Sequence, residues 1–482
     1  MRTMNLKWAF AFAAVGLMTA PLALAIEQGT AATPVKRVSA AEPTYGSYFA
    51  SDFQDEAEAP SVPAPDGDAV PVAPGDGGAC GCEKSSCNSC CRDRLIQDCN
   101  PIDCDDCDPW RLFGCYNDSN CLGLNVYGFV AVGYAYNGER PANRSNLPVT
   151  FIDRDNELTG NQAWMTIEKT IDQDCCNWQL GGRVDFMAGS DARYTQAAGL
   201  DDKWINRHGY GSALPQAYLE IGNDRLSVKL GHYYTIIGYE VVPANGNFFM
   251  SHAYTMQYGE PFTHTGALAT YKLNDQVNVM AGADLGWDVW RDNNRSASFL
   301  GGVSWTSCDE RTTVAFTGSI GKEPLTGPFA NPANVSSTRW MTSLVVSHEL
   351  TSRWTYVLQS DISNQRAGTI GTTPIPRGEA YGINQYVFYK VNCCWDAGLR
   401  FEWFRDDDGG RVTNAAGNNF AGNFYEVTAG LNWKPRCNWI IRPEARWDWF
   451  DGAQVPGGAN LPYNGGAQAR QFTLACDVIM LW

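Results

Sequence analysis

Several features common in other protein classes are scarce in this 482-residue chain. Charged residues make up only 18% of it, and 36 basic side chains face 52 acidic ones, which gives a net charge of -16. That balance argues against nucleic acid as a partner. Beyond the N-terminus there is no run of about twenty apolar residues, and the mean hydropathy is -0.29. A helical membrane protein is therefore excluded.

Sequence motifs of common enzymes are missing as well. The chain has no G-x-S-x-G, Walker or H-E-x-x-H motif, and its five histidines stand at 208, 232, 252, 264 and 348. We therefore predict a protein that is not an enzyme and needs no cofactor or metal ion. A Ser-His-Asp site is defined in space rather than in sequence, so an outer-membrane hydrolase stays open as an alternative.

The N-terminus has the pattern of an export signal. Arg2 and Lys7 supply positive charge ahead of the apolar stretch Trp8–Leu24, so residues 1–25 are predicted to be a signal peptide. Residues 26–79 are rich in Ala, Pro and Asp and hold few side chains able to form a core. This composition predicts a disordered acidic linker.

Cysteine is abundant, with seventeen in all, and ten of them fall within residues 80–121. The pairs Cys87/Cys90 and Cys104/Cys107 have zinc-ribbon spacing. Export to an oxidising compartment favours disulfides over zinc, and the odd total leaves at least one thiol free or bonded to another chain. The candidate disulfide cysteines are Cys80, Cys82, Cys87, Cys90, Cys91, Cys99, Cys104, Cys107, Cys115, Cys121, Cys175, Cys176, Cys308, Cys393, Cys394 and Cys437. We hypothesise that this cysteine-rich periplasmic module is bonded to the periplasmic rim or to other cysteine-rich envelope proteins.

Residues 122–482 alternate apolar and polar side chains in segments of about 10 residues, the length of a tilted transmembrane strand. The sixteen predicted segments span 124–137, 161–171, 177–190, 213–222, 225–238, 262–273, 276–290, 298–307, 311–321, 338–349, 353–363, 379–391, 394–405, 422–434, 438–450 and 469–482. We predict an all-β fold, a transmembrane antiparallel barrel of about 16 strands.

The connections between these segments alternate in length. Tight turns at 223–224, 274–275 and 392–393 are separated by longer connections such as 239–261 and 451–468. Short periplasmic turns and long outer loops are typical of outer-membrane barrels, and sixteen strands leave room for a water-filled channel. The predicted location is the cell outer membrane, in contact with its lipid, with the N-terminal segment in the periplasm.

The alternation predicts which side chains face lipid and which face the lumen. Aromatic residues near both strand ends would form two interfacial girdles: Trp178, Trp354, Trp395 and Trp439 near the short turns, and Trp287, Trp290, Trp403, Trp447 and Trp449 near the long loops. The predicted lumen-lining charges are Arg183, Asp185, Glu220, Lys229, Asp284, Asp288, Arg400, Glu402, Arg442, Glu444 and Arg446. A hydrated interior accounts for them, and so does a plugged barrel filled with ion pairs.

Four motifs resemble a known family: Gly231–Tyr234, Gly238–Glu240, Phe248–Tyr254 and Tyr258–Gly266. They are similar to the outer-membrane β-barrel porins described as OmpL-like, especially planctomycete-type members. The resemblance covers essentially the barrel. It implies a pore, and similarity to sixteen-stranded porins implies a homotrimer.

The third long connection carries most of the resembling motifs. In sixteen-stranded porins the corresponding loop folds into the lumen, so Glu240, His252 and Glu260 are predicted to form a constriction whose carboxylates favour cations. The alternative is that the loop only packs at the pore mouth. The predicted function is passive diffusion of small hydrophilic solutes or ions, and the alternative is a structural envelope barrel cross-linked through cysteines.

Overall fold

The computed structural model describes residues 124–171, 176–204, 208–325, 335–370, 372–375, 377–414, 419–452 and 461–482. The predicted signal peptide, acidic linker and cysteine-rich module lie outside these ranges. None of the helices in the described part of the chain is long and apolar enough to cross a membrane.

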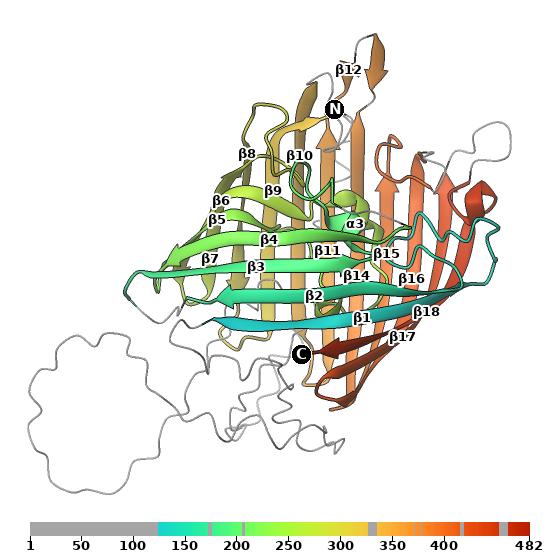
Figure 1. Ribbon diagram of the computed structural model, residues 1–482, viewed down its shortest axis with the longest axis horizontal. Helices are drawn as coiled ribbons and strands as arrows, with labels where there is room; N and C mark the ends of the chain where they lie inside the picture. The colour runs from blue at the N-terminus through green and yellow to red at the C-terminus, as the bar shows by residue number, and fades with distance from the viewer. Residues whose placement is uncertain are drawn as a thin grey trace, which may run out of the picture. The chain divides into compact units, whose positions relative to one another are not determined.

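Sixteen antiparallel strands of the described residues pair into one closed barrel (Figure 1). They are β1 (Asn125–Asn137), β2 (Glu157–Lys169), β3 (Gln179–Gly189), β4 (Gly211–Gly222), β5 (Leu226–Tyr234), β6 (Thr263–Asn274), β7 (Val277–Asp284), β8 (Ser298–Thr306), β9 (Thr312–Pro324), β10 (Ser336–Glu349), β11 (Trp354–Gln365), β14 (Gly378–Asn392), β15 (Trp395–Asp406), β16 (Gly422–Arg436), β17 (Trp439–Gly452) and β18 (Arg470–Leu481). Each strand pairs with its neighbours in sequence, and β1 closes the barrel on β18, with Val132 opposite Val478.

Smaller elements lie in the connections. Strands β12 (Gly368–Ile370) and β13 (Thr373–Ile375) form a separate two-stranded sheet between β11 and β14. Four short helical segments complete the described elements: α3 (Ala192–Thr195), η1 (Ala244–Gly246), η2 (Thr255–Gly259) and η3 (Asn464–Gly466).

The predicted fold class is confirmed, because each of the sixteen predicted segments overlaps one barrel strand. Two predicted segments were too long at their ends near the long loops. The segment 225–238 stops being a strand at Tyr234, and 276–290 stops at Asp284. Beyond Asp284 the backbone turns at Gly286, whose φ of 110° is a conformation that favours glycine.

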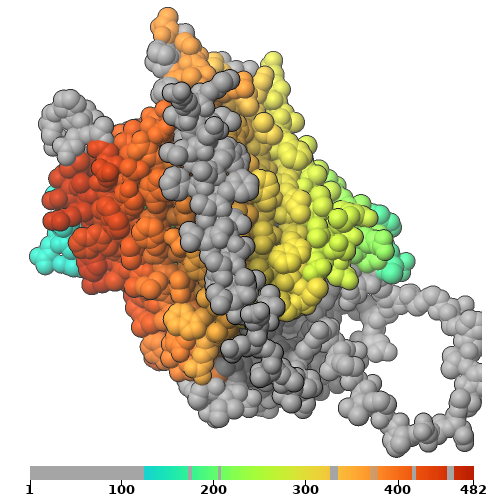
Figure 2. Space-filling model, turned by 180° about the vertical axis from the view of Figure 1, so that it is seen from behind, coloured from blue at the N-terminus to red at the C-terminus, as the bar shows by residue number. Residues whose placement is uncertain are grey.

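The two faces of the strands follow the predicted alternation. On β17, Trp439 and Trp447 are exposed while Arg442, Glu444 and Arg446 are buried. Because successive side chains point to opposite faces of a strand, the exposed set covers the outer wall and the buried set faces the interior. Figure 2 views the outer wall over the strands coloured from yellow-green to red.

The prediction that Trp287 belongs to an interfacial girdle is wrong. Trp287 is only 5% exposed and lies inside, where its Nε1 donates to Ser319 Oγ at 3.0 Å and the Arg339 guanidinium lies 4.7 Å from its ring centroid. The alternation in sequence continues past Asp284, but the strand does not, so the side chain no longer follows the outward face.

Candidate functional site

The connection between β5 and β6, residues 235–262, lies inside the barrel, and we call it the inner loop. Its side chains pack against strands on several sides of the lumen: Val242 and Phe262 in a cluster with β1–β4, and Met250 and Tyr254 in one with β14–β18. The ring of Phe248 lies 4.9 Å from that of Phe388 on β14. The inner loop therefore fills part of the barrel interior.

Side chains of the wall hold the main chain of the inner loop. Glu444 on β17 accepts from the N–H groups of Met250, at 2.8 Å, and Ser251, at 3.2 Å. Glu402 on β15 accepts from the N–H groups of Tyr254, at 2.6 Å, and Thr255, at 2.7 Å. A loop inside a barrel has no strand partner, so these carboxylates satisfy main-chain donors that would otherwise be buried without acceptors.

Arginines on the same two strands bind the carbonyl groups of the loop. Arg442 donates to Ala244 O and Asn247 O, both at 2.6 Å. Arg400 donates to Ser251 O at 2.7 Å, and Arg446 to His252 O at 2.6 Å. The clamp is the name we give to five residues: Arg400, Glu402, Arg442, Glu444 and Arg446. Within each strand they stand two apart and so point inward together.

Carboxylates on the wall neutralise the clamp arginines. Arg400 Nε lies 2.5 Å from Glu426 Oε1, Arg442 Nη2 lies 2.5 Å from Asp477 Oδ2, and Arg446 Nη2 lies 2.9 Å from Asp448 Oδ1. All of these side chains are at most 2% exposed. A buried charge is costly unless it is paired, and each guanidinium is paired both with a carboxylate and with loop carbonyls.

The structure brings two of the three predicted constriction residues into contact. His252 Nδ1 and Glu240 Oε2 lie 3.0 Å apart, and Arg400 Nη1 lies 2.7 Å from Glu240 Oε1. Burial opposes ionisation of Glu240, but the charge of Arg400 and the hydrogen bond from His252 outweigh it and lower its pKa to about 2. Glu240 is thus an ionised carboxylate bound within the clamp.

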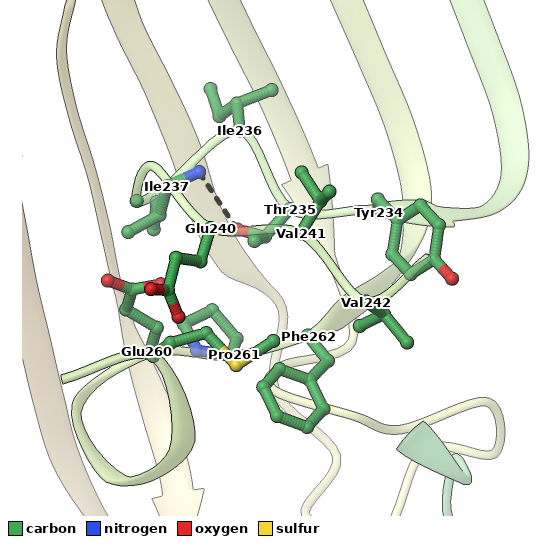
Figure 3. A pocket seen from close by; sticks show the side chains of 12 residues that line it. Tyr234, Thr235, Ile236, Ile237, Glu240, Val241, Val242, Glu260, Pro261 and Phe262 are labelled. Atoms are coloured by element: carbon green, nitrogen blue, oxygen red, sulfur yellow. Dashed lines mark hydrogen bonds between the residues drawn. The ribbon is translucent and has the colours of Figure 1, made fainter. Parts of the chain in front are cut away.

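Glu260 belongs to a different contact, at the end of the loop. The amide nitrogen of Gln359 donates both to Glu260 and to Asp361 Oδ2, the latter at 2.8 Å. Burial and the nearby Asp361 carboxylate raise the pKa of Glu260 well above its ordinary value. Figure 3 shows the carboxyl groups of Glu240 and Glu260 on the same side of a pocket that is otherwise mostly apolar.

The other predicted lumen-lining charges have local partners. Arg183 Nε lies 3.0 Å from Asp185 Oδ1, Glu220 accepts from Ser227, and Lys229 Nζ lies 5.1 Å from the ring centroid of Tyr218. Asp284 Oδ2 lies 3.2 Å from His264 Nδ1. Asp288 follows β7 rather than lying on a strand, and it accepts from the N–H groups of Phe262 and Thr263 at 3.0 and 2.9 Å.

Sequence reasoning missed two partners of the clamp arginines, Glu426 and Asp477. It also missed Gln359 and Asp361, which lie at the contact of Glu260. The inward phase of each strand was the available signal, since Asp477 lies directly opposite Arg442. Pairing them required the register between strands, which the alternation alone does not provide.

The described cysteines fall into two groups. Two candidate disulfide cysteines, Cys176 and Cys308, are free and exposed, which corrects their assignment, and Cys476 is also free. The short turns that hold Cys176 and Cys308 leave these thiols open to solvent. Disulfide bonds are present at Cys393, Cys394 and Cys437, which we call the rim cysteines.

A family model described as "Putative beta-barrel porin-2, OmpL-like" matches residues 123–481. No curated protein matches the sequence. Among solved structures, the outer membrane channel DcaP of Acinetobacter baumannii is 12% identical with a TM-score of 0.48, over 74% of this chain and 97% of that one. An anion-selective porin from Comamonas acidovorans is 10% identical with a TM-score of 0.47, over 74% of this chain and 99% of that one.

Proposed function

Because the chain belongs to the OmpL-like β-barrel porin family, whose model matches residues 123–481, and is an outer-membrane porin channel, we propose that small hydrophilic solutes or ions diffuse through it. The path runs through the barrel interior, and the inner loop narrows it. The observation that carries this proposal is the clamp, because it holds the loop inside the lumen by its main chain.

The clamp supports a constriction of defined width. Main-chain contacts fix where the loop lies, whatever side chains it carries, and buried hydrogen bonds to charged groups contribute more than neutral ones. Glu240 adds a loop side chain to the same network through Arg400. A loop held this way stays in place while solutes pass beside it.

The charges around the loop support a preference for cations. Three clamp arginines face six carboxyl groups, those of Glu240, Glu402, Glu426, Glu444, Asp448 and Asp477. Carboxylates that line a narrow passage attract cations and repel anions. Glu240, whose pKa is lowered to about 2, is the ionised loop carboxylate of the proposed constriction. Glu260 is its second carboxyl group, and its raised pKa favours the protonated form.

The test is single-channel recording of the purified mature protein in a planar bilayer. Ohmic current steps in salt support the channel, and reversal potentials in a salt gradient measure its ion preference. Glu240→Gln should shift the reversal potential toward anions, because it removes an ionised carboxylate. Glu260→Gln should do so only at a pH high enough to ionise Glu260, whose pKa is raised. Glu379→Gln, at the start of β14 outside the loop and the clamp, serves as the control. Unchanged reversal potentials in both loop variants would refute the proposed constriction.

A folded barrel that stays silent in this assay would favour the structural envelope barrel over the diffusion channel. Native mass spectrometry of the same preparation measures the mass of the assembly and tests the expected homotrimer. A monomeric mass would contradict that expectation without affecting the channel.

A further inference from the structure

Two arginines outside the clamp lie against the same aromatic side chain. The guanidinium carbon of Arg339 lies 4.7 Å from the ring centroid of Trp287, and that of Arg411 lies 5.4 Å from it. Arg339 is on β10, Trp287 follows β7, and Arg411 belongs to the connection between β15 and β16. Three separate parts of the barrel therefore bring two positive charges to one buried ring.

The connection after β15 is folded so that Arg411 has a fixed place. The Asp406 carboxylate accepts from three successive N–H groups, those of residues 410–412, at 3.0, 2.8 and 2.9 Å. Val412 is fully buried in a cluster that includes Phe424 on β16. Main-chain hydrogen bonds and apolar packing thus hold this part of the connection, and neither depends on the guanidinium group of Arg411.

Neither of these guanidinium groups is neutralised as the clamp arginines are. Within the described part of the chain, neither forms an ion pair with a carboxylate. Arg339 donates through Nε, at 3.1 Å, and through Nη2, at 2.6 Å, to the uncharged amide oxygen of Gln365. The Nη2 atom of Arg411 is buried and has no hydrogen-bond partner among the described residues. Each clamp arginine, by contrast, is paired with a carboxylate.

The carboxyl groups that act on Arg411 are engaged by other donors. Asp406 holds the turn, and Glu323 accepts from the N–H group of Trp287 at 3.2 Å. Burial, and then the positive charge of Arg339, lower the pKa of Arg411 to about 9 against the attraction of Asp406 and Glu323, so it is still charged at neutral pH. The Trp287 ring attracts both cations but offers no acceptor to a buried N–H group. An anion beside Arg411 would gain from both charges and would accept from Nη2.

We propose that Arg339 and Arg411 bind a small oxyanion, a carboxylate or phosphate group, beside the ring of Trp287. Guanidinium groups present paired N–H donors that match two oxygens of such a group. Arg411 is only half-buried, and both arginines lie toward the strand ends that carry the long connections. A dissolved anion therefore reaches the site from the side of the long connections.

This site deepens the proposed function, on which it rests for the path by which the solute arrives. It assigns an oxyanion group to one class of solute. A constriction that favours cations is compatible with it, because neither arginine belongs to the inner loop or to the clamp. The bound anion occupies fixed guanidinium groups, whereas the preference among mobile ions is set where the inner loop narrows the path.

Isothermal titration calorimetry of the folded mature protein in detergent tests the site without a current. Sodium acetate and sodium phosphate are titrated separately, each against sodium chloride at the same ionic strength. We expect saturable binding of at least one probe: acetate alone assigns a carboxylate group, and phosphate alone a phosphate group. Heats no larger than those of chloride for both probes would overturn the proposal. A silent barrel that binds a probe would refute only the diffusion channel, and a conducting one that binds neither would refute only this site.

Two variants and a matched control assign the binding to these arginines. Arg339→Gln and Arg411→Gln should each weaken binding at least about tenfold, because each loses hydrogen bonds between opposite charges. The control is Arg377→Gln, just ahead of β14, where Arg377 is 49% exposed and is paired with Glu379 and Asp408, and it should bind like the parent. Migration on a semi-native gel checks folding. If a variant does not fold, the unfolding temperature of the parent should still be higher in acetate or phosphate than in chloride. Parent-like binding in Arg411→Gln, or an equal loss in Arg377→Gln, would refute the site.

Discussion

Truncation of Glu402 is the sharpest test of the clamp. Its carboxylate accepts the N–H groups of Tyr254 and Thr255, at 2.6 and 2.7 Å, and the Thr255 hydroxyl at 2.6 Å. In Glu402→Ala the hydroxyl can turn elsewhere, but two buried N–H groups lose their acceptor. Each such loss costs about 1–3 kcal/mol, so the anchorage of the loop weakens by about 2–6 kcal/mol.

That change should be visible in single-channel recordings. Since about 1.4 kcal/mol corresponds to a tenfold change in an equilibrium, the released population of the inner loop rises at least about 25-fold. We expect a higher mean conductance and many more fluctuations. The heat stability of the barrel should stay near that of the parent, because the side chain of Glu402 takes no part in the hydrogen bonds between strands.

The control for this experiment is the neighbouring residue on the opposite face. Phe401 is 39% exposed on the outer wall, so Phe401→Ala alters the same strand without touching the clamp. Parent-like currents in Glu402→Ala, or an equal rise in Phe401→Ala, would show that this carboxylate does not hold the loop in the path.

Three further predictions concern charge. Because the pKa of Glu240 is lowered to about 2, its anchorage is complete above the ordinary carboxyl pKa of about 4.3 and is lost as pH falls through the lower value. The frequency of current fluctuations in the parent should rise as the pH falls. In Glu240→Gln the fluctuations should already be frequent at neutral pH and should not increase further in acid. The pKa of Glu260 is raised by burial and by Asp361, so its ionisation weakens anchorage as pH rises above the ordinary carboxyl range, and Glu260→Gln should abolish an alkaline rise in fluctuations. On the outer wall Leu399 is 54% exposed. If this side chain lies near the bilayer midplane, Leu399→Arg should lower the free energy of unfolding, measured by refolding into lipid, by about 2–4 kcal/mol. Leu399→Ala is its control, and equal folding of the two would place this side chain away from lipid.

The strands were predictable because their signal is local. In β17 and β18 every second side chain faces lipid, so apolar residues such as Trp447 and Leu474 alternate with charged ones such as Arg446 and Asp477. Turn residues mark the ends, as Asn223 does between β4 and β5, where its side chain accepts from the N–H groups two and three residues on.

The same local signal failed where the chain leaves the wall but stays buried. After Tyr234 and after Asp284 the residues remain apolar, because the inner loop and Trp287 pack against the interior rather than against lipid. Alternation does not distinguish an apolar residue that faces lipid from one that faces an internal core, so both strands were predicted to be too long.

The candidate site was only partly predictable for a related reason. The clamp residues were identified as inward-facing charges from the phase of β15 and β17. Their binding partners are main-chain groups of the inner loop, and a carbonyl or N–H group has no sequence signature. The contact between Glu240 and Arg400 joins residues 160 positions apart.

By itself, the sequence determined the fold class, the strands and the two faces of the wall. A membrane barrel imposes a period of two on the side chains of every strand and an alternation of short and long connections between strands. Only the tertiary structure decided that the lumen charges are used to grip a loop, because that depends on where a long connection packs inside the barrel. It likewise decided which of the described cysteines are bonded, since bonding depends on distance in space rather than along the chain.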